Sequence, residues 1–224
     1  IVDPVAGATG VLPPPEGYLE RLRSLCTKHG ILLIFDEVIT AFGRVGAEFA
    51  AKRFGVVPDI ITTAKGLTNG GIPMGAVLVT DGIYKTIVQG PPQAVEFFHG
   101  YTYSGHPIAT AAALATHDAY QDEGTFEQAR NLETVFEAAI HSLSDHPNVI
   151  DIRNFGLMGA IELAPLADGP CMRVLAIHKD CFWNENLVIR SSGDILQFSP
   201  FLNSKAEDIE ATFQKVGRAI SRVG

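Results

Sequence analysis

The stretch that decides the fold is residues 31–37, which read Ile-Leu-Leu-Ile-Phe-Asp-Glu. The first five residues form a continuous apolar run of strand length. Such a run, without alternation, is typical of a strand that is buried on both faces of a parallel sheet. Asp36 follows the run directly. Ligands of open α/β sheets bind beyond the carboxyl ends of the strands, so Asp36 is expected at the rim of such a site.

The segments around this strand alternate between helical and extended patterns. Apolar residues recur at helical spacing over residues 17–29, and a second helix is predicted over residues 47–54. Strands are predicted at residues 59–63 and 74–80, with a glycine-rich loop at residues 66–71 between them. This alternation with short connections indicates an α/β architecture.

The second half of the chain has a different pattern. Residues 108–120 are rich in alanine and residues 126–143 are amphipathic, so two helices are expected. After them we expect strands at 149–153 and 157–163, a helix at 172–184, strands at 187–190 and 195–198, and a helix at 205–223. This is the pattern of an α+β unit, and we therefore predict two domains, residues 1–122 and 123–224.

The composition excludes several classes of protein. Of the 224 residues, 46% are hydrophobic and 19% are charged, and the formal net charge is −8. The chain is too apolar for disorder, and no stretch approaches the roughly 20 apolar residues of a membrane-spanning helix. The acidic balance argues against nucleic-acid binding. Three cysteines without CxxC spacing, and histidines without ligand spacing, predict a reducing compartment, no disulfide framework and no metal site.

Lys65 and Asp36 follow neighbouring predicted strands. An amine at a strand end beside glycines is poorly solvated and can act as a nucleophile. A lysine paired with an aspartate suits pyridoxal phosphate, because the lysine forms a Schiff base and the carboxylate keeps the pyridine nitrogen protonated. On spacing alone, however, a solvated aspartate and a surface lysine are the commoner outcome.

The same stretch allows an alternative interpretation. Four apolar residues followed by Asp36 and Glu37 resemble the Walker B strand of a P-loop ATPase, where the aspartate holds Mg²⁺. That interpretation requires a GxxxxGK[ST] loop, and the sequence contains none. It also leaves Lys65 without a role, so we rank it low.

Four longer motifs resemble those of the class III aminotransferases. Residues 32–44 read LLIFDEVITAFGR, which is similar to the family's LLIFDEV(I/Q)TGFGR signature, and residues 58–70 resemble the segment that carries the Schiff-base lysine. Residues 99–107, HGYTYSGHP, resemble the HGxTxxGxP loop and are closest to the ω-amino acid:pyruvate branch, which includes β-alanine:pyruvate aminotransferases. Residues 186–194 resemble the GLLxRxxGD strand. The four motifs occur in the family's order across the chain.

This resemblance implies a fold type I transferase that depends on pyridoxal phosphate. Residues 1–122 would form the C-terminal part of the large domain, with a mainly parallel sheet, and residues 123–224 the small domain. The implied reaction transfers an amino group from an ω- or β-amino acid or amine to pyruvate, giving alanine. The implied assembly is a cytoplasmic homodimer or tetramer. Family members are roughly twice this length, so the chain resembles their C-terminal half.

The resemblance also implies roles for single residues. Lys65 would form the Schiff base and then move a proton, while Asp36 would pair with the pyridinium nitrogen. Val38, two residues on and on the same side of an extended chain, would pack on the ring face. Thr102 would donate its hydroxyl and backbone N–H to the phosphate in the neighbouring subunit. Arg190 would bind a substrate carboxylate as a bidentate fork.

Four positions depart from the family pattern, among them Phe201 and Asn203, which replace a proline and an apolar residue of the usual SPPLI. Asp3 stands where the family commonly has glutamate. Ala41 replaces a glycine, and its Cβ would strain the turn if φ there were positive. Arg44, in the same motif, is expected to fix the loop by hydrogen bonds.

Two further alternatives stay open beside the ATPase. One is a sister activity of the same family on ornithine, GABA, a diamine or glutamate semialdehyde. The other is an inactive fragment that folds without turnover.

Overall fold

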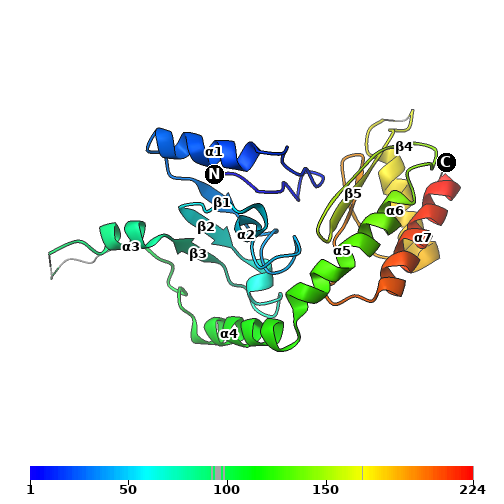
Figure 1. Ribbon diagram of the computed structural model, residues 1–224. Helices are drawn as coiled ribbons and strands as arrows, with labels where there is room; N and C mark the ends of the chain where they lie inside the picture. Colours follow the sequence, from blue (N-terminus) through cyan, green and yellow to red (C-terminus); the bar gives the residue numbers. More distant parts are fainter. Residues whose placement is uncertain (92, 94–96, 98, 168, 224) are drawn as a thin grey trace.

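The computed structural model describes residues 1–91, 93, 97, 99–167 and 169–223, and it shows two β-sheets that are joined through helices (Figure 1). The first sheet has the strand order β1-β2-β3 and the second the order β4-β5-β7-β6. The α/β half and the α+β half that the sequence pattern predicts are both present. Together they determine where the candidate site lies.

The first sheet brings two strand ends together. Its strands are β1 (Ile34–Asp36), β2 (Ile60–Thr63) and β3 (Ala76–Val79). β1 and β2 are parallel, with Asp36 opposite Thr62, whereas β3 runs antiparallel to β2. Because β1 and β2 run in the same direction, their carboxyl ends meet at one edge of the sheet, as the sequence predicts.

Two helices bury one apolar core against this sheet. They are α1 (Tyr18–Lys28) and α2 (Ala50–Phe54). The buried members of this core are Leu19, Cys26, Leu33, Phe35 and Val56. The amphipathic pattern of residues 17–29 therefore predicts the helix and part of its buried face, because Leu19 and Cys26 are buried whereas Leu25 is 39% exposed.

The apolar run at residues 31–35 is only partly a buried strand. Ile31 and Leu32 precede β1 and are 57% and 56% exposed, whereas Phe35 is fully buried. The paired segment begins at Ile34, where β2 starts, so the first residues of the run have no neighbouring strand. Burial of the whole run on both faces was a wrong prediction for this chain.

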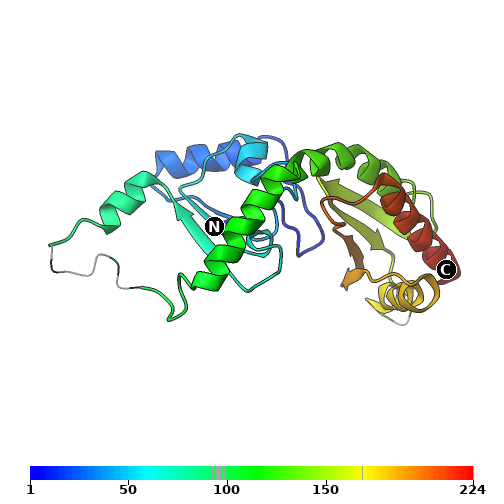
Figure 2. The ribbon, with the colours of Figure 1, turned by 90° about the horizontal axis from the view of Figure 1, so that it is seen from below.

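Within the described part of the chain, three helices connect the two sheets. They are α3 (Asp81–Ile87), α4 (Pro107–Asp122) and α5 (Thr125–His141). α3 was not predicted from the sequence. Figure 2 shows α4 running past the first sheet and leading into α5 at the second. The turn between them contains Gly124, whose φ of +61° is accessible to glycine at little cost.

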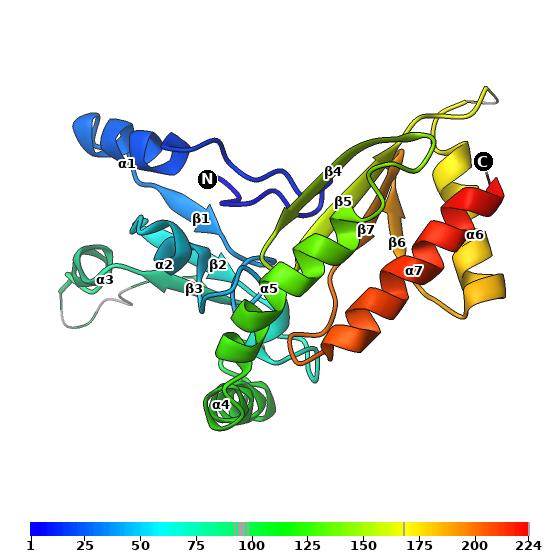
Figure 3. The same cartoon turned by 45° about the vertical axis from the view of Figure 1, so that its right-hand side comes forward.

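The second sheet is entirely antiparallel. Its strands are β4 (Val149–Phe155), β5 (Met158–Leu163), β6 (Arg190–Ser192) and β7 (Ile195–Phe198). α5, α6 (Met172–Glu185) and α7 (Ala206–Val223) cover one of its faces (Figure 3). β6 begins at Arg190, later than predicted. A two-residue turn at Gly193 and Asp194 sets its register, with Ser192 opposite Ile195.

The N-terminal segment packs on the second sheet. Val5 and Val11 share a buried cluster with Met158 and Ala160. The Arg153 side chain donates from Nε to the carbonyl oxygen of Gly10 at 3.1 Å. The two halves of the chain therefore share a core, and the division into residues 1–122 and 123–224 stays a prediction.

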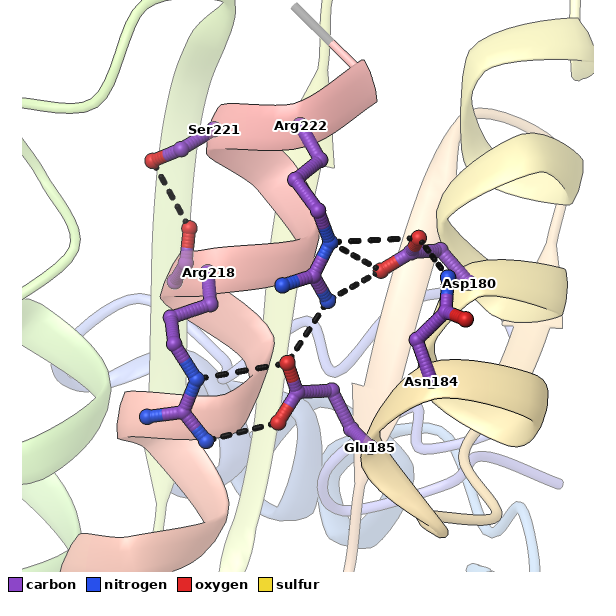
Figure 4. Close-up of polar contacts among 7 residues, drawn as sticks. Asp180, Asn184, Glu185, Arg218, Ser221 and Arg222 are labelled. Atoms are coloured by element: carbon purple, nitrogen blue, oxygen red, sulfur yellow. Dashed lines mark hydrogen bonds and ion pairs between the residues drawn. The ribbon is translucent and has the colours of Figure 1, made fainter.

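An ion-pair network joins α6 to α7 (Figure 4). Arg218 and Arg222 each place Nη2 2.6 Å from the Glu185 carboxylate, and Arg222 also contacts Asp180. Hydrogen bonds from these two arginines hold the pKa of Glu185 at about 2, below its ordinary 4.5. Folding therefore favours the ionised carboxylate.

We expect this network to make stability depend on acid pH. A lowered folded-state pKa contributes stability that is complete above about pH 4.5 and is lost as the pH falls toward 2. Glu185→Gln should lower the midpoint of thermal unfolding at pH 7, and the difference from the wild type should close near pH 2. Glu210→Gln, on the exposed side of α7, is the control. A difference that is equal at both pH values would contradict the assignment.

Candidate functional site

A cavity of about 810 Å³ is lined by both halves of the chain. The first half contributes the turn after β1, the loop after β2 and the last turns of α4. The second half contributes β5, the start of β6, the end of β7 and residues 199–203. Lys65, Val38 and Arg190 are all among the lining residues. The fold thus brings together three of the predicted site residues that lie far apart in the sequence.

Lys65 occupies an unusual backbone conformation. It begins the short 3₁₀ helix η1 (Lys65–Leu67) with a φ of +44°, which is rare for a residue with a Cβ. Backbone N–H groups of Thr68 and Gly70 donate to its carbonyl oxygen. Its side chain is exposed and makes no hydrogen bond or ion pair with the residues that the structure describes. An amine held this way is available to a ligand in the cavity.

Asp36 and Val38 form a tight turn at the end of β1. The Oδ1 atom of Asp36 accepts a hydrogen bond from the backbone N–H of Val38 at 3.1 Å. Glu37 still donates its backbone N–H to Thr62 of β2, but the turn begins at Val38, so the prediction that Val38 continues the extended chain was wrong. Val38 nevertheless lines the cavity, whereas Asp36 is not among the lining residues.

Asp3 joins this strand edge, which sequence reasoning missed. Val2 bridges Phe35 in parallel, so Asp3 lies at the end of a short extended segment beside β1. Burial and the charge of Asp36 raise the pKa of Asp3, while the charge of Lys65 lowers it. Asp3 is therefore close enough to both Asp36 and Lys65 for their charges to act on it. The available signal was an acidic residue at the end of an apolar pair, the pattern that also marks Asp36.

Arg190 and Thr102 have different relations to the cavity. Arg190 lies at the start of β6, is exposed, and has no side-chain partner in the described part of the chain. Its guanidinium is free to bind an anion. Thr102 lies in an exposed turn in which the Ser104 N–H donates to the Tyr101 carbonyl. Thr102 does not line this cavity, so the chain does not bring it to Lys65.

Arg44 holds the loop by hydrogen bonds, as predicted. Its Nη1 atom donates to the carbonyl oxygens of Leu157 at 3.1 Å and Pro200 at 2.7 Å. Burial lowers the pKa of this guanidinium to about 10. The strain considered at Ala41 does not arise, because the left-handed residues of the turn are Phe42 and Gly43, with φ of +58° and +90°.

Glu37 is a second residue whose role sequence reasoning missed. Its side chain is fully buried, yet its two carboxylate oxygens accept hydrogen bonds from the backbone N–H groups of Ala50 and Ala51. The Thr40 hydroxyl donates a third, at 3.1 Å. Burial raises the pKa of Glu37, and these hydrogen bonds oppose the rise. The carboxylate thus closes the loop between β1 and α2 directly beside Asp36.

Neither a metal-binding cluster nor a membrane-spanning helix occurs among the described residues. No group of three or more His, Cys, Asp or Glu side chains there is arranged to hold a metal ion. Of the helices that the structure describes, none has the length and apolarity needed to cross a membrane.

Comparison with known proteins gives one consistent result. The family model for class III aminotransferases matches residues 1–220. The chain is 51% identical over its whole length to an ω-aminotransferase of Caulobacter vibrioides, and 47% identical to a β-alanine–pyruvate aminotransferase of Pseudomonas aeruginosa. It covers 51% and 50% of these proteins, so it spans about half the length of the curated relatives that it matches.

Solved structures show the same fold. An amine transaminase from an uncultivated Pseudomonas species, in its pyridoxal phosphate-bound form, matches 99% of this chain with a TM-score of 0.91 and 36% identity. An (S)-enantioselective ω-transaminase from Thermomicrobium roseum matches 99% with a TM-score of 0.90 and 35% identity. The chain covers 51% and 50% of these two structures. The predicted transaminase fold is confirmed.

The buried carboxylate of Glu37 leads to a stability prediction. Glu37→Gln replaces an acceptor oxygen by an NH₂ group, which cannot accept the hydrogen bond from Ala50 or Ala51. Because a buried donor left unpaired costs about 1–3 kcal/mol, the free energy of unfolding in urea should fall by about that amount. Glu137→Gln, on the exposed face of α5, should leave it nearly unchanged. Equal losses in the two variants would refute the role given to Glu37.

Proposed function

The chain belongs to the class III aminotransferase family, and from this premise we propose that it serves pyridoxal phosphate-dependent transfer of an amino group from an ω- or β-amino acid, or a related amine, to pyruvate. The observation that carries the proposal is the shared cavity of Lys65 and Arg190. The names of the relatives at 47–51% identity support an ω-amino acid as donor and pyruvate as acceptor. The activity proposed is that of the whole protein in which these residues work.

The residues present fit pyridoxal phosphate. Lys65 offers an amine without an internal partner in the described part of the chain. The backbone N–H of Val38 holds the carboxylate of Asp36 by a hydrogen bond. The charge of Asp36 raises the pKa of Asp3 and the charge of Lys65 lowers it. The cavity, at about 810 Å³, falls within the roughly 300–1,000 Å³ typical of small-molecule sites.

In this proposal each residue has a separate task. The cofactor, when bound, supplies an electron sink for the carbon that loses its proton. Lys65 holds the cofactor and then moves the proton at the amine-bearing carbon, a positioned transfer worth roughly 10²–10⁴-fold. Asp36 would keep the ring nitrogen of the bound cofactor protonated through its negative charge. Val38, in the cavity wall, would pack its side chain against the ring.

Arg190 gives the site its selectivity for acids. A guanidinium without an internal partner binds a carboxylate through two parallel hydrogen bonds. Arg190 comes from β6, and Lys65 comes from the loop after β2. A substrate with an amine at one end and a carboxylate at the other suits a cavity that has these two groups in its walls.

We propose in addition that two copies of the protein assemble, as a dimer or within a tetramer. Thr102 is exposed and does not line the cavity of its own chain, which is consistent with its binding the phosphate in the neighbouring subunit. Three free cysteines, two of them buried, are consistent with a reducing, cytoplasmic location.

Replacing Lys65 tests the proposed function. After loading with pyridoxal phosphate and reduction with borohydride, peptide mass analysis of the wild-type protein should find the adduct on Lys65. Lys65→Ala should lose this adduct and reduce alanine formation from pyruvate by at least about 100-fold. Lys179→Ala, which removes an exposed lysine of α6, should keep both. Normal transamination by Lys65→Ala would refute the proposal.

Replacing Arg190 tests the substrate class. Arg190→Gln removes a charged donor pair, so the KM for pyruvate and for β-alanine should rise about 10- to 100-fold. The KM for an amine donor without a carboxylate should not change. Arg21→Gln, on the exposed face of α1, is the control. An equal rise for donors with and without a carboxylate would show that Arg190 does not bind the acid group.

A further inference from the structure

Tyr120 connects α4 to the loop that carries Lys65. It lies in the last turn of α4 and is 7% exposed. Its hydroxyl donates a hydrogen bond to the carbonyl oxygen of Gly66 at 2.8 Å. Gly66 directly follows Lys65, and all three residues line the cavity. The hydroxyl therefore holds the carbonyl group of the residue that directly follows Lys65.

The backbone at Lys65 needs such a restraint. A φ of +44° is unfavourable for lysine, and a conformation of this kind persists only where the surroundings enforce it. The Gly66 carbonyl can also accept the N–H of Asn69, at 3.3 Å, which is a long hydrogen bond. The shorter contact from Tyr120 is therefore the stronger hold on this carbonyl.

The side chain of Phe42 restrains the backbone of Gly66 from another side. A Cβ placed on Gly66 would lie 2.8 Å from the Cβ of Phe42, so the backbone of Gly66 is in close contact with that side chain. The ring of Phe42 stacks on that of Tyr120, with centroids 6.2 Å apart. On its other side Tyr120 contacts Phe126 of α5, at 5.0 Å between centroids. These neighbours fix the direction in which the hydroxyl points.

We propose that Tyr120 is a positioning residue, whose hydroxyl holds the Gly66 carbonyl and thereby keeps Lys65 in the backbone conformation that presents its amine to the cavity. The proposal rests on the proposed function of Lys65, which it deepens. Tyr120 touches neither substrate nor cofactor in this role. The Gly66 carbonyl belongs to the peptide unit between Gly66 and Leu67, so the effect of Tyr120 reaches Lys65 through the backbone of Gly66.

Hydrogen exchange in the cofactor-free full chain tests this hold directly. Tyr120→Phe removes the hydroxyl and keeps the ring. We expect the amides of residues 67–70 to exchange about five- to tenfold faster, while those of β1 exchange at the wild-type rate. Tyr84→Phe, an exposed tyrosine of α3, should change neither segment. An unchanged rate at residues 67–70, or an equal rise at β1, would overturn the proposal.

Kinetics of the cofactor-loaded full chain give a second readout. Tyr120→Phe should lower kcat about tenfold and slow the trapping of Lys65 by borohydride, without changing the KM for pyruvate. Normal kcat together with a raised KM would overturn the positioning role. A failure of the function proposed for Lys65 is distinguishable from a failure of the role proposed for Tyr120. In the first case the wild-type protein itself would give no adduct on Lys65. The exchange rates at residues 67–70 decide the role of Tyr120 in either case.

Discussion

The parallel pairing of β1 with β2 is the constraint on which the site depends. The register Ile34 to Ile60 and Asp36 to Thr62 puts the two strand ends side by side. A slip of one residue would turn Phe35 out of the core and Asp36 into it, because side chains alternate between the faces of a sheet. Burial of Phe35 therefore fixes the carboxylate at the rim. The hydrogen bonds to Glu37 then hold the turn that follows. Core packing therefore determines which side chains lie at the edge of the sheet where β1 and β2 end.

The second sheet completes the cavity and depends on the first for its position. Val5 and Val11 pack against Met158 and Ala160. Arg44 donates to the carbonyl of Leu157, between β4 and β5, and to that of Pro200, after β7. Arg190 therefore faces the cavity because the N-terminal segment is seated on the sheet that carries it. A ligand that contacts Lys65 and Arg190 together would bridge two parts of the chain that are joined by this shared apolar cluster.

How much the sequence could predict depends on the range of each interaction. Asp36 and Lys65 are predictable because a strand and the residue after it are local patterns, and the longer motifs made the family recognisable. Glu37 was missed because its partners lie 13 and 14 residues away, at a helix start that only the folded loop brings near. Tyr120 was missed for the same reason, since 54 residues separate it from Gly66. Val38 was placed in an extended segment because nothing local indicates where the strand ends.

The edge strand β3 has a consequence for the behaviour of the chain in solution. Within the described residues β3 pairs only with β2, and Val77, Leu78 and Val79 are 65%, 44% and 39% exposed. Its free edge offers backbone N–H and C=O groups beside branched apolar side chains, which is the arrangement that recruits another strand. No lysine or proline interrupts these three residues. Where no other strand covers this edge, two copies of the chain can pair through β3, and a charged residue at position 77 would oppose that pairing.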